Sequence, residues 1–233
     1  MSTTTSLTER LRDGCARDWE RLHTHPFVRG LANATLPAEA FRFYIEQNLQ
    51  YLREYARAMA LGASRADDVA TMRIFAADLA TVVDVEIPQN EELLSRTLEL
   101  GARDRGGADG MAPATLAYTS FLVATAARGS TLEIMAAILP CTWSYGEIGS
   151  RLVGEVVEHP VYTDWIRFFG NADYAQIVAK MRRDFEERAA EADERTTHRL
   201  AFLFDASVRL EREFWDMGHR LEHWPDVHAR YAD

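Results

Sequence analysis

The sequence contains only two cysteines, Cys15 and Cys141, among its 233 residues. A disulfide framework needs several cysteines at paired spacings, so this usage is typical of a reducing compartment. No apolar run approaches the roughly 20 residues that a membrane-spanning helix requires. Residues 1–6 are polar and uncharged, unlike the basic and apolar start of a secretory signal. We therefore expect a cytoplasmic protein in which residues 1–6 are disordered.

Blocks of lysine or arginine are also absent, and the formal net charge is −10. Nucleic-acid binding requires a basic surface that neutralises phosphates, so this function class is disfavoured. An anionic membrane surface is disfavoured for the same electrostatic reason. A small neutral or cationic molecule is the partner that this charge balance favours.

Segments that alternate with a period of two are missing as well, so no strand is predicted. Apolar residues instead recur at helical spacing, as in the series Leu11, Cys15, Trp19 and Leu22. The pattern predicts one all-α domain over residues 1–233, a bundle of about eight helices. The expected helices cover about residues 8–23, 37–64, 67–100, 113–128, 131–157, a short segment around Trp165, 172–192 and 194–223. The third should bend at Ile87-Pro88, and residues 101–110 should form an exposed loop.

Cys141 follows a proline inside a long apolar helix. Pro140 has no N–H to donate, so we expect a kink there, with Cys141 beside it and Tyr145 one turn further on the same face. A thiol next to an aromatic hydroxyl suits attack on an electron-poor ring. A free cysteine is more often a small buried hydrophobe, however, and the sequence does not show the thiol pKa.

Glu211 is a second candidate because it interrupts an apolar helix face formed by Phe204, Val208 and Trp215. Burial of an unpaired carboxylate is costly and raises its pKa, which would make it a proton donor near neutral pH. The alternative is that Glu211 lies at the edge of this face and pairs with an arginine of the same helix.

Two patterns resemble metal sites in their letters. Residues 219–223 read His-Arg-Leu-Glu-His, but few residues remain for a third zinc ligand downstream. The acidic group Asp84, Glu86, Glu91 and Glu92 lacks the Glu-x-x-His pairs of a di-iron site, because position 90 is asparagine. We predict no metal and interpret the acidic group as a solvated face.

The pattern Leu-Pro-Cys-x-Trp-x-Tyr-x-Glu-Ile-Gly at residues 139–149 resembles the cysteine motif of the TenA family, the thiaminase II or aminopyrimidine aminohydrolase group. The similarity also includes His-Pro-Phe-Val at residues 25–28, His-Pro-Val-Tyr at residues 159–162, and Glu211 followed by Phe-Trp. This resemblance implies a haem-oxygenase-like helical fold without haem, a homotetramer, and a reaction that needs no cofactor.

The resemblance also implies roles for individual residues. Cys141 would be the nucleophile and Glu211 the acid and base, acting on thiamin or on an aminomethylpyrimidine to release the hydroxymethylpyrimidine. Tyr51 and Tyr118 would sandwich the pyrimidine ring. The residues expected to contact the substrate are Asn48, Tyr51, Tyr118, Tyr145, Phe169 and Phe214.

Two of these positions depart from the family. Asn48 stands where the family has a ring-binding aspartate, and an amide cannot supply the proton that a carboxyl group can. Phe169 stands where related proteins have a tyrosine hydroxyl near the thiol. Two alternatives therefore stay open: a pyrimidine-binding or divergent TenA-like protein with another substrate, and a haem-oxygenase-like oxidase.

Overall fold

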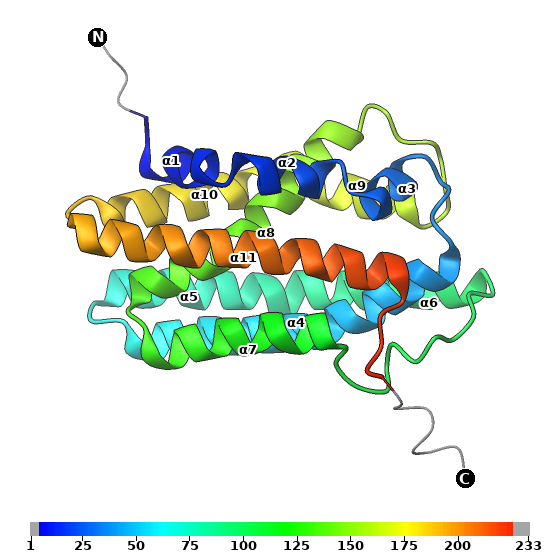
Figure 1. Ribbon diagram of the computed structural model, residues 1–233, viewed down its shortest axis with the longest axis horizontal. Helices are drawn as coiled ribbons and strands as arrows, with labels where there is room; N and C mark the ends of the chain where they lie inside the picture. Colours follow the sequence, from blue (N-terminus) through cyan, green and yellow to red (C-terminus); the bar gives the residue numbers. More distant parts are fainter. Residues whose placement is uncertain (1–4, 226–233) are drawn as a thin grey trace.

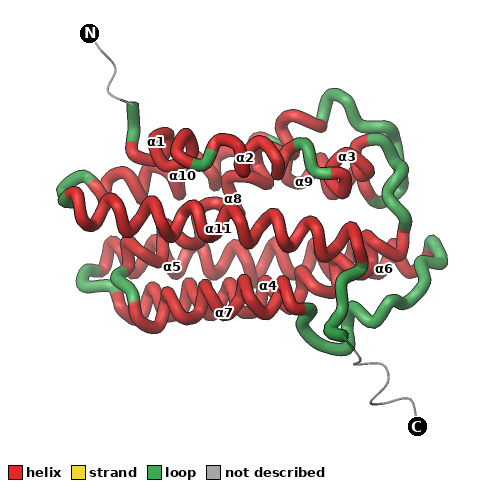
Figure 2. The backbone as a smooth tube through the Cα atoms, viewed as in Figure 1, coloured by secondary structure: helices red, strands yellow, loops and turns green. Residues whose placement is uncertain are grey.

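The computed structural model describes residues 5–225, and every regular element among them is helical. The long helices run side by side as a bundle, with short helices along one edge (Figures 1 and 2). The helices are α1 (Leu7–Gly14), α2 (Ala16–His23), α3 (Pro26–Ala32), α4 (Ala38–Arg65), α5 (Val69–Thr81), α6 (Ile87–Glu99), α7 (Pro113–Arg128), α8 (Thr131–Leu152), α9 (Tyr162–Phe169), α10 (Ala172–Ala189) and α11 (Glu194–Arg220). The expected all-α, haem-oxygenase-like fold class is confirmed.

The described part contains more helical segments than the sequence predicted, partly because the first expected helix is divided. Cys15 leaves helical geometry at φ −119° and ψ 24°, which separates α1 from α2. Helix α3 was missed, because no helix was expected between residues 23 and 37. The Nδ1 atom of His25 accepts a hydrogen bond from the Phe27 N–H, and Pro26 occupies the first turn, so this segment starts a helix.

A π-helical turn, Val82–Glu86, joins α5 to α6 at the expected bend. Pro88 cannot donate a hydrogen bond to the carbonyl group four residues earlier, and the chain widens just before it. The Ile87 N–H binds the Val82 carbonyl, five residues back. Such turns hold one extra residue and occur often at functional sites.

The start of the described chain is held by Ser6. Its hydroxyl accepts a hydrogen bond from the Glu9 N–H, and the Glu9 carboxylate accepts one from the Ser6 N–H, which together form a capping box. The expectation of disorder is therefore wrong for Ser6. Residues 1–4 lie outside the described residues.

Helix α8 is the central element of the bundle and packs against α4, α7, α9, α10 and α11. It continues through Pro140 without ending there. The ring of Trp215 on α11 stacks on Tyr145 of α8 at 5.1 Å and on Tyr44 of α4 at 5.3 Å. These buried rings fix the three helices that carry the candidate site. Among the described residues, no helix is both long and apolar enough to cross a membrane.

We predict that Gly149→Ala destabilises the fold. A Cβ atom at this position would lie 2.4 Å from the nitrogen of Gly170 and from the carbonyl carbon of Phe169, so α8 and the end of α9 must separate. The free energy of unfolding should fall by about 1–3 kcal/mol in urea denaturation. Gly14→Ala is the matched control, because a Cβ atom there meets nothing within 4 Å. Equal stability of the two variants would contradict this prediction.

Candidate active site

One face of α4 carries four polar or aromatic side chains at helical spacing: Tyr44, Asn48, Tyr51 and Tyr55. All four are buried. The hydroxyl of Tyr55 donates to the Ile138 carbonyl on α8 at 3.1 Å. The hydroxyl of Tyr44 lies 3.1 Å from that of Tyr145, also on α8. This face of α4 therefore lies directly against the cysteine helix.

Cys141 lies on α8 and forms no disulfide. It keeps part of its accessible surface, whereas Pro140 and Thr142 on either side are buried. Burial raises the pKa of the Cys141 thiol well above its usual value, and the negative charge of Glu211 raises it further. The sulfur therefore rests as a thiol and needs a base before it can act as a nucleophile.

Glu211 is almost fully buried, with 1% of its surface exposed. The alternative that it pairs with an arginine of its own helix is wrong. Arg209 binds Asp205 at 2.7 Å, and Arg212 binds Asp18 and the adjacent Glu213. Glu211 is thus a carboxyl group inside an aromatic core, as its place on the apolar face of the helix suggested.

Burial raises the pKa of Glu211 to about 7, and the groups that oppose this shift are the hydroxyls of Tyr118 and Tyr145 and the thiol of Cys141. Glu211 and Cys141 are distant in the sequence, yet each is close enough to shift the pKa of the other. The structure therefore brings together the two side chains that the resemblance marked as catalytic.

Two buried polar atoms of this site have no hydrogen-bond partner among the described residues: Oε2 of Glu211 and the hydroxyl oxygen of Tyr51. Buried polar atoms are nearly always paired, so each exception needs an explanation. The Tyr51 hydroxyl acts on the thiol of Cys141, whose pKa it lowers. Both atoms thus lie around the sulfur, where a polar ligand would satisfy them.

Tyr51 and Tyr118 are neighbours, but they do not form a sandwich. Their ring centroids are 4.9 Å apart, whereas a third ring between them would need roughly 7 Å. The ring of Phe214 packs on Tyr51 at 5.5 Å. The Tyr118 hydroxyl lies 2.9 Å from the Ser207 hydroxyl. These three rings form one continuous aromatic wall.

Phe169 packs edge-on against the ring of Tyr145, with centroids 4.8 Å apart. It also contacts Trp165 at 4.7 Å and Tyr174 at 5.0 Å. Its contribution is therefore ring packing that supports Tyr145, and no hydroxyl is added to the site at this position.

The orientation of Asn48 is fixed by a short relay. Its Nδ2 donates to Oδ1 of Asn90 at 3.0 Å, and Nδ2 of Asn90 donates to the backbone carbonyl of Glu86 at 2.8 Å. A carbonyl oxygen can only accept, so it sets the direction of both amides. Oδ1 of Asn48 accepts no hydrogen bond among the described residues and is available as an acceptor.

Glu86 was expected on the solvated face with the other acids of this segment, and this prediction is wrong. Asp84, Glu91 and Glu92 are exposed, as a solvated face requires, but Glu86 is not. Burial raises the pKa of Glu86 to about 7, and its charge acts on the thiol of Cys141. The π turn shifts the helical register by one residue, so a period of 3.6 residues did not reveal this inward position. Among the described residues, no group of three or more His, Cys, Asp or Glu side chains could hold a metal ion.

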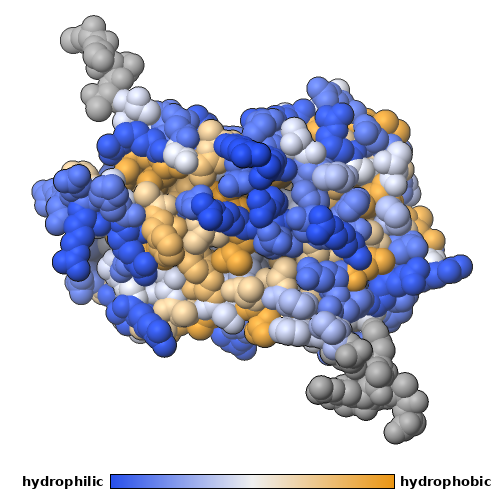
Figure 3. All heavy atoms as spheres, in the orientation of Figure 1, coloured by the Kyte–Doolittle hydropathy of each residue, from blue (hydrophilic) through white to orange (hydrophobic). Residues whose placement is uncertain are grey.

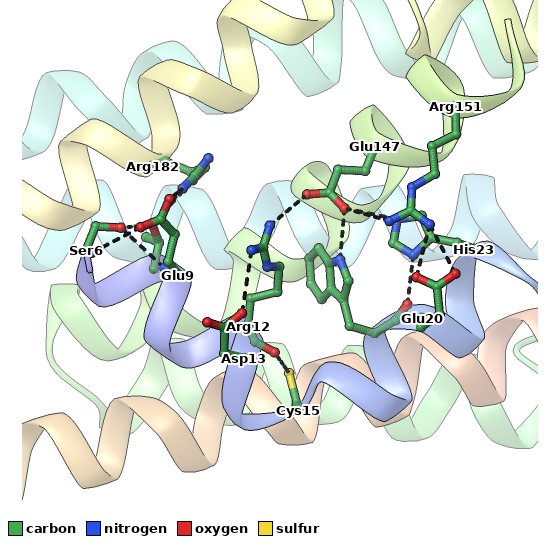
Figure 4. A network of polar contacts seen from close by, with 12 residues as sticks. Ser6, Glu9, Arg12, Asp13, Cys15, Glu20, His23, Glu147, Arg151 and Arg182 are labelled. Carbon is green, nitrogen blue, oxygen red and sulfur yellow. Dashed lines mark hydrogen bonds and ion pairs between the residues drawn. The ribbon is translucent and has the colours of Figure 1, made fainter. Parts of the chain in front are cut away.

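Glu147 belongs to the cysteine motif, but it serves a separate polar network between α2 and α8 (Figure 4). Its carboxylate accepts from Trp19 Nε1 at 3.0 Å and lies 3.2 Å from Nε2 of His23. Burial alone would raise the pKa of Glu147, but the contacts with His23, Trp19 and Arg12 outweigh burial and lower it to about 2. Glu147 therefore joins two helices and is not part of the site around the sulfur.

Residues 15–221 match the TENA/THI-4/PQQC family. The chain is 35% identical over 208 residues to an aminopyrimidine aminohydrolase of Halalkalibacterium halodurans. This match covers 88% of this chain and 92% of the relative. It is 32% identical over 220 residues to an aminopyrimidine aminohydrolase of Bacillus subtilis, covering 94% and 92%. A solved TenA homologue from P. horikoshii OT3 superposes with a TM-score of 0.81 at 28% identity, covering 93% of this chain and 99% of that one.

The family match covers most of the sequence and includes both Cys141 and Glu211. The helical fold and the two aminohydrolases, each more than 30% identical to this chain, agree with it. This chain belongs to the TENA/THI-4/PQQC family.

Proposed function

We propose that this chain is an aminopyrimidine aminohydrolase of thiamin salvage, acting as one helical domain in the cytoplasm. The observation that carries the proposal is that the Glu211 carboxyl group is buried close enough to the Cys141 thiol for each to shift the pKa of the other. The names of the two most similar relatives reported above support the reaction. The two unpaired cysteines support the location.

In the first step, the Glu211 carboxylate takes the proton of the Cys141 thiol. The sulfur adds to the ring carbon next to the one that carries the aminomethyl group. The carbon–sulfur bond forms, and the electron pair of the broken ring double bond moves to the exocyclic carbon and expels the amine. Glu211 gives its proton to the departing nitrogen, so ammonia leaves as a neutral molecule.

In the second step, Glu211 takes a proton from water while the oxygen adds to the exocyclic methylene carbon. The electron pair returns to the ring, the carbon–sulfur bond breaks, and the proton passes from Glu211 to the sulfur. The ring is aromatic again and carries a hydroxymethyl group. A pKa of about 7 allows Glu211 to act as both base and acid near neutral pH.

We predict that Cys141→Ala abolishes release of hydroxymethylpyrimidine from aminomethylpyrimidine and from thiamin, and that Glu211→Gln lowers kcat by about 10²–10⁴-fold. Product release can be followed by chromatography. Cys15→Ala is the matched control, because this second buried thiol contacts only the carbonyl oxygens of Leu11 and Arg12. Its activity should equal that of the unmodified protein.

Full activity of Cys141→Ala, or an unmodified protein that is inactive on both substrates, would rule out the proposed hydrolysis. Saturable pyrimidine binding without any product would instead support a binding protein. Asn48 is the observation that favours this second function, because its amide replaces the carboxyl group found in related proteins.

We predict that Glu211→Gln stabilises the protein at alkaline pH. The pKa of Glu211 is raised from 4.5 to about 7 by burial, so its favourable contribution is complete below about pH 4.5 and is lost as the pH rises through 7. At pH 8 the variant should be more stable than the unmodified protein by up to about 3 kcal/mol. Urea denaturation from pH 4.5 to 8 measures this difference.

The matched control for this measurement is Glu213→Gln, whose carboxylate is half exposed and contacts Arg212. Its stability should stay within about 0.5 kcal/mol of the unmodified protein at each pH. If Glu211→Gln keeps the pH dependence of the unmodified protein, the buried carboxyl group is not its source.

We further propose that the protein forms a homo-oligomer, a homotetramer by analogy with its family. Hydrophobic side chains gather on the face over α11 and α7 (Figure 3). Leu116 on α7 is 43% exposed and Phe202 on α11 is 60% exposed. Small residues line the outer groove of α7 beside Leu116, namely Ser120, Ala124 and Ala127, and they permit close approach of another helix.

Leu116→Glu should lower the mass measured by light scattering to that of one chain of 26.4 kDa, because a charge would be buried in the contact. The helical circular dichroism should not change, since Leu116 is exposed within one chain. A monomeric unmodified protein at micromolar concentration would contradict this proposal.

A further inference from the structure

Glu86 is an ionisable group close to the sulfur that the hydrolysis described above does not use. Its carboxyl group makes no hydrogen bond or ion pair within the described residues, and it keeps part of its accessible surface. Its charge nevertheless acts on Cys141, Tyr55 and Tyr174, whose side chains lie on α8, α4 and α10. Glu86 therefore lies on the side of the π turn that faces these helices.

The backbone around Glu86 places it there. It ends the π turn, and the relay through Asn90 binds its carbonyl group and reaches Asn48 on α4. Side chains at positions 86 and 90 lie on the same side of the helix, one turn apart. The Glu86 carboxyl group and the Asn48 amide are thus held on the same side of the site.

Other charged groups around the π turn do not neutralise Glu86. Asp78 on α5 is turned toward Lys180 of α10, with its carboxylate 4.0 Å from the ammonium nitrogen. Tyr55 donates to the Ile138 carbonyl. No cation therefore holds the Glu86 carboxyl group in its charged form, and burial favours the protonated form.

The edge of an aminopyrimidine presents a donor beside an acceptor: the N–H of the ring amine and the neighbouring ring nitrogen. Asn48 can accept from the ring amine through Oδ1, and the N–H of its Nδ2 that is not bound to Asn90 can still donate, but an amide cannot give up a proton. The ring nitrogen, which gains electron density when the sulfur adds, still needs an acid. A protonated carboxyl group on the same side of the site completes the match.

We propose that Glu86 is a further catalytic residue of this site. Its carboxyl group binds the ring nitrogen beside the amine of an aminopyrimidine and transiently transfers a proton to it. Asn48 then binds the ring amine and Glu86 binds the ring nitrogen. Two residues thus provide the hydrogen bond and the proton that a single carboxyl group at position 48 would provide. This role presupposes the hydrolysis proposed above.

The proton transfer balances within the reaction. As the sulfur adds and the carbon–sulfur bond forms, the electron pair of the broken ring double bond forms a new double bond to the ring carbon that bears the amine. The carbon–nitrogen double bond of that carbon opens onto the ring nitrogen, which takes the proton of Glu86. When that pair moves on to expel the amine, the nitrogen returns the proton to the Glu86 carboxylate. The same exchange runs again when water adds and the sulfur leaves.

The test compares Glu86→Gln with the unmodified protein by measuring kcat and KM for aminomethylpyrimidine from pH 5.5 to 9. Glutamine has nearly the same shape but cannot transfer a proton, so kcat should fall by about 10²–10⁴-fold while KM changes less. The fall of kcat above pH 7, where Glu86 loses its proton, should disappear in the variant. Asn48→Asp added to Glu86→Gln should restore kcat at least tenfold, because a carboxyl group returns to the same edge.

Asp84→Asn is the matched control, since this exposed acid lies on the same π turn and should leave every parameter unchanged. Unchanged kcat and pH profile in Glu86→Gln would overturn the proposal. A fall in kcat with an unaltered pH profile and no rescue by Asp at position 48 would overturn it too, since that pattern reports a structural role. 

An inactive unmodified protein would count against the hydrolysis, and binding of the product hydroxymethylpyrimidine would then test Glu86 alone. In calorimetry, the Kd of the unmodified protein should rise about tenfold per pH unit above 7, and that of Glu86→Gln should not. Equal pH dependence of the two Kd values would overturn the role of Glu86.

Discussion

The burial of a single carboxyl group, that of Glu211, determines how the rest of the site is built. Three helices enclose it with aromatic rings, and the stack of Tyr44, Trp215 and Tyr145 excludes water from its surroundings. This exclusion brings the pKa of Glu211 close to neutrality, so one group can take and return protons. The same exclusion raises the pKa of the Cys141 thiol, which stays protonated until a base is in contact with it. The ionisation of the thiol and that of the carboxyl group therefore depend on each other, and the fold must hold α8 and α11 in one arrangement.

Helical periodicity predicted most of this fold because nearly every long helix has a continuous apolar face. The errors lie where local chemistry overrides that periodicity. Cys15 interrupts the first helix without any proline or apolar break in the sequence. In the opposite direction, no helix was expected at Pro26, but a proline in the first turn starts α3. The loop at residues 101–110 and the bend before Pro88 were correct, because glycine and proline act there through backbone geometry alone.

The sequence predicted less of the site than of the fold. Spacing placed Cys141 and Tyr145 on one face of a helix. Spacing did not bring Cys141 to Glu211; that pairing came from the resemblance to a family. Glu86 was assigned to the solvated face together with Asp84, Glu91 and Glu92, because this acidic group lacks Glu-x-x-His pairs. Only the extra residue of the π turn directs Glu86 inward. The contact between the rings of Tyr51 and Tyr118 depends on tertiary packing, so no pattern within one helix contains it.

The relay through Asn90 also bears on which heterocycles the site accepts. Because Nδ2 of Asn48 is occupied, rotating the amide would leave Asn90 Oδ1 facing the Asn48 oxygen and would break a buried hydrogen bond. Oδ1 of Asn48 therefore stays an acceptor, and a pyrimidine with an oxygen in place of the ring amine would set two acceptors against each other. Such a site rejects the wrong ring by repulsion and by a lost hydrogen bond as well as by poorer fit. A carboxyl group at position 48 that changes its protonation could accept either ring. The substitution of asparagine for aspartate thus narrows the choice of substrate, while a protonated carboxyl group on the neighbouring helix keeps the acid chemistry available.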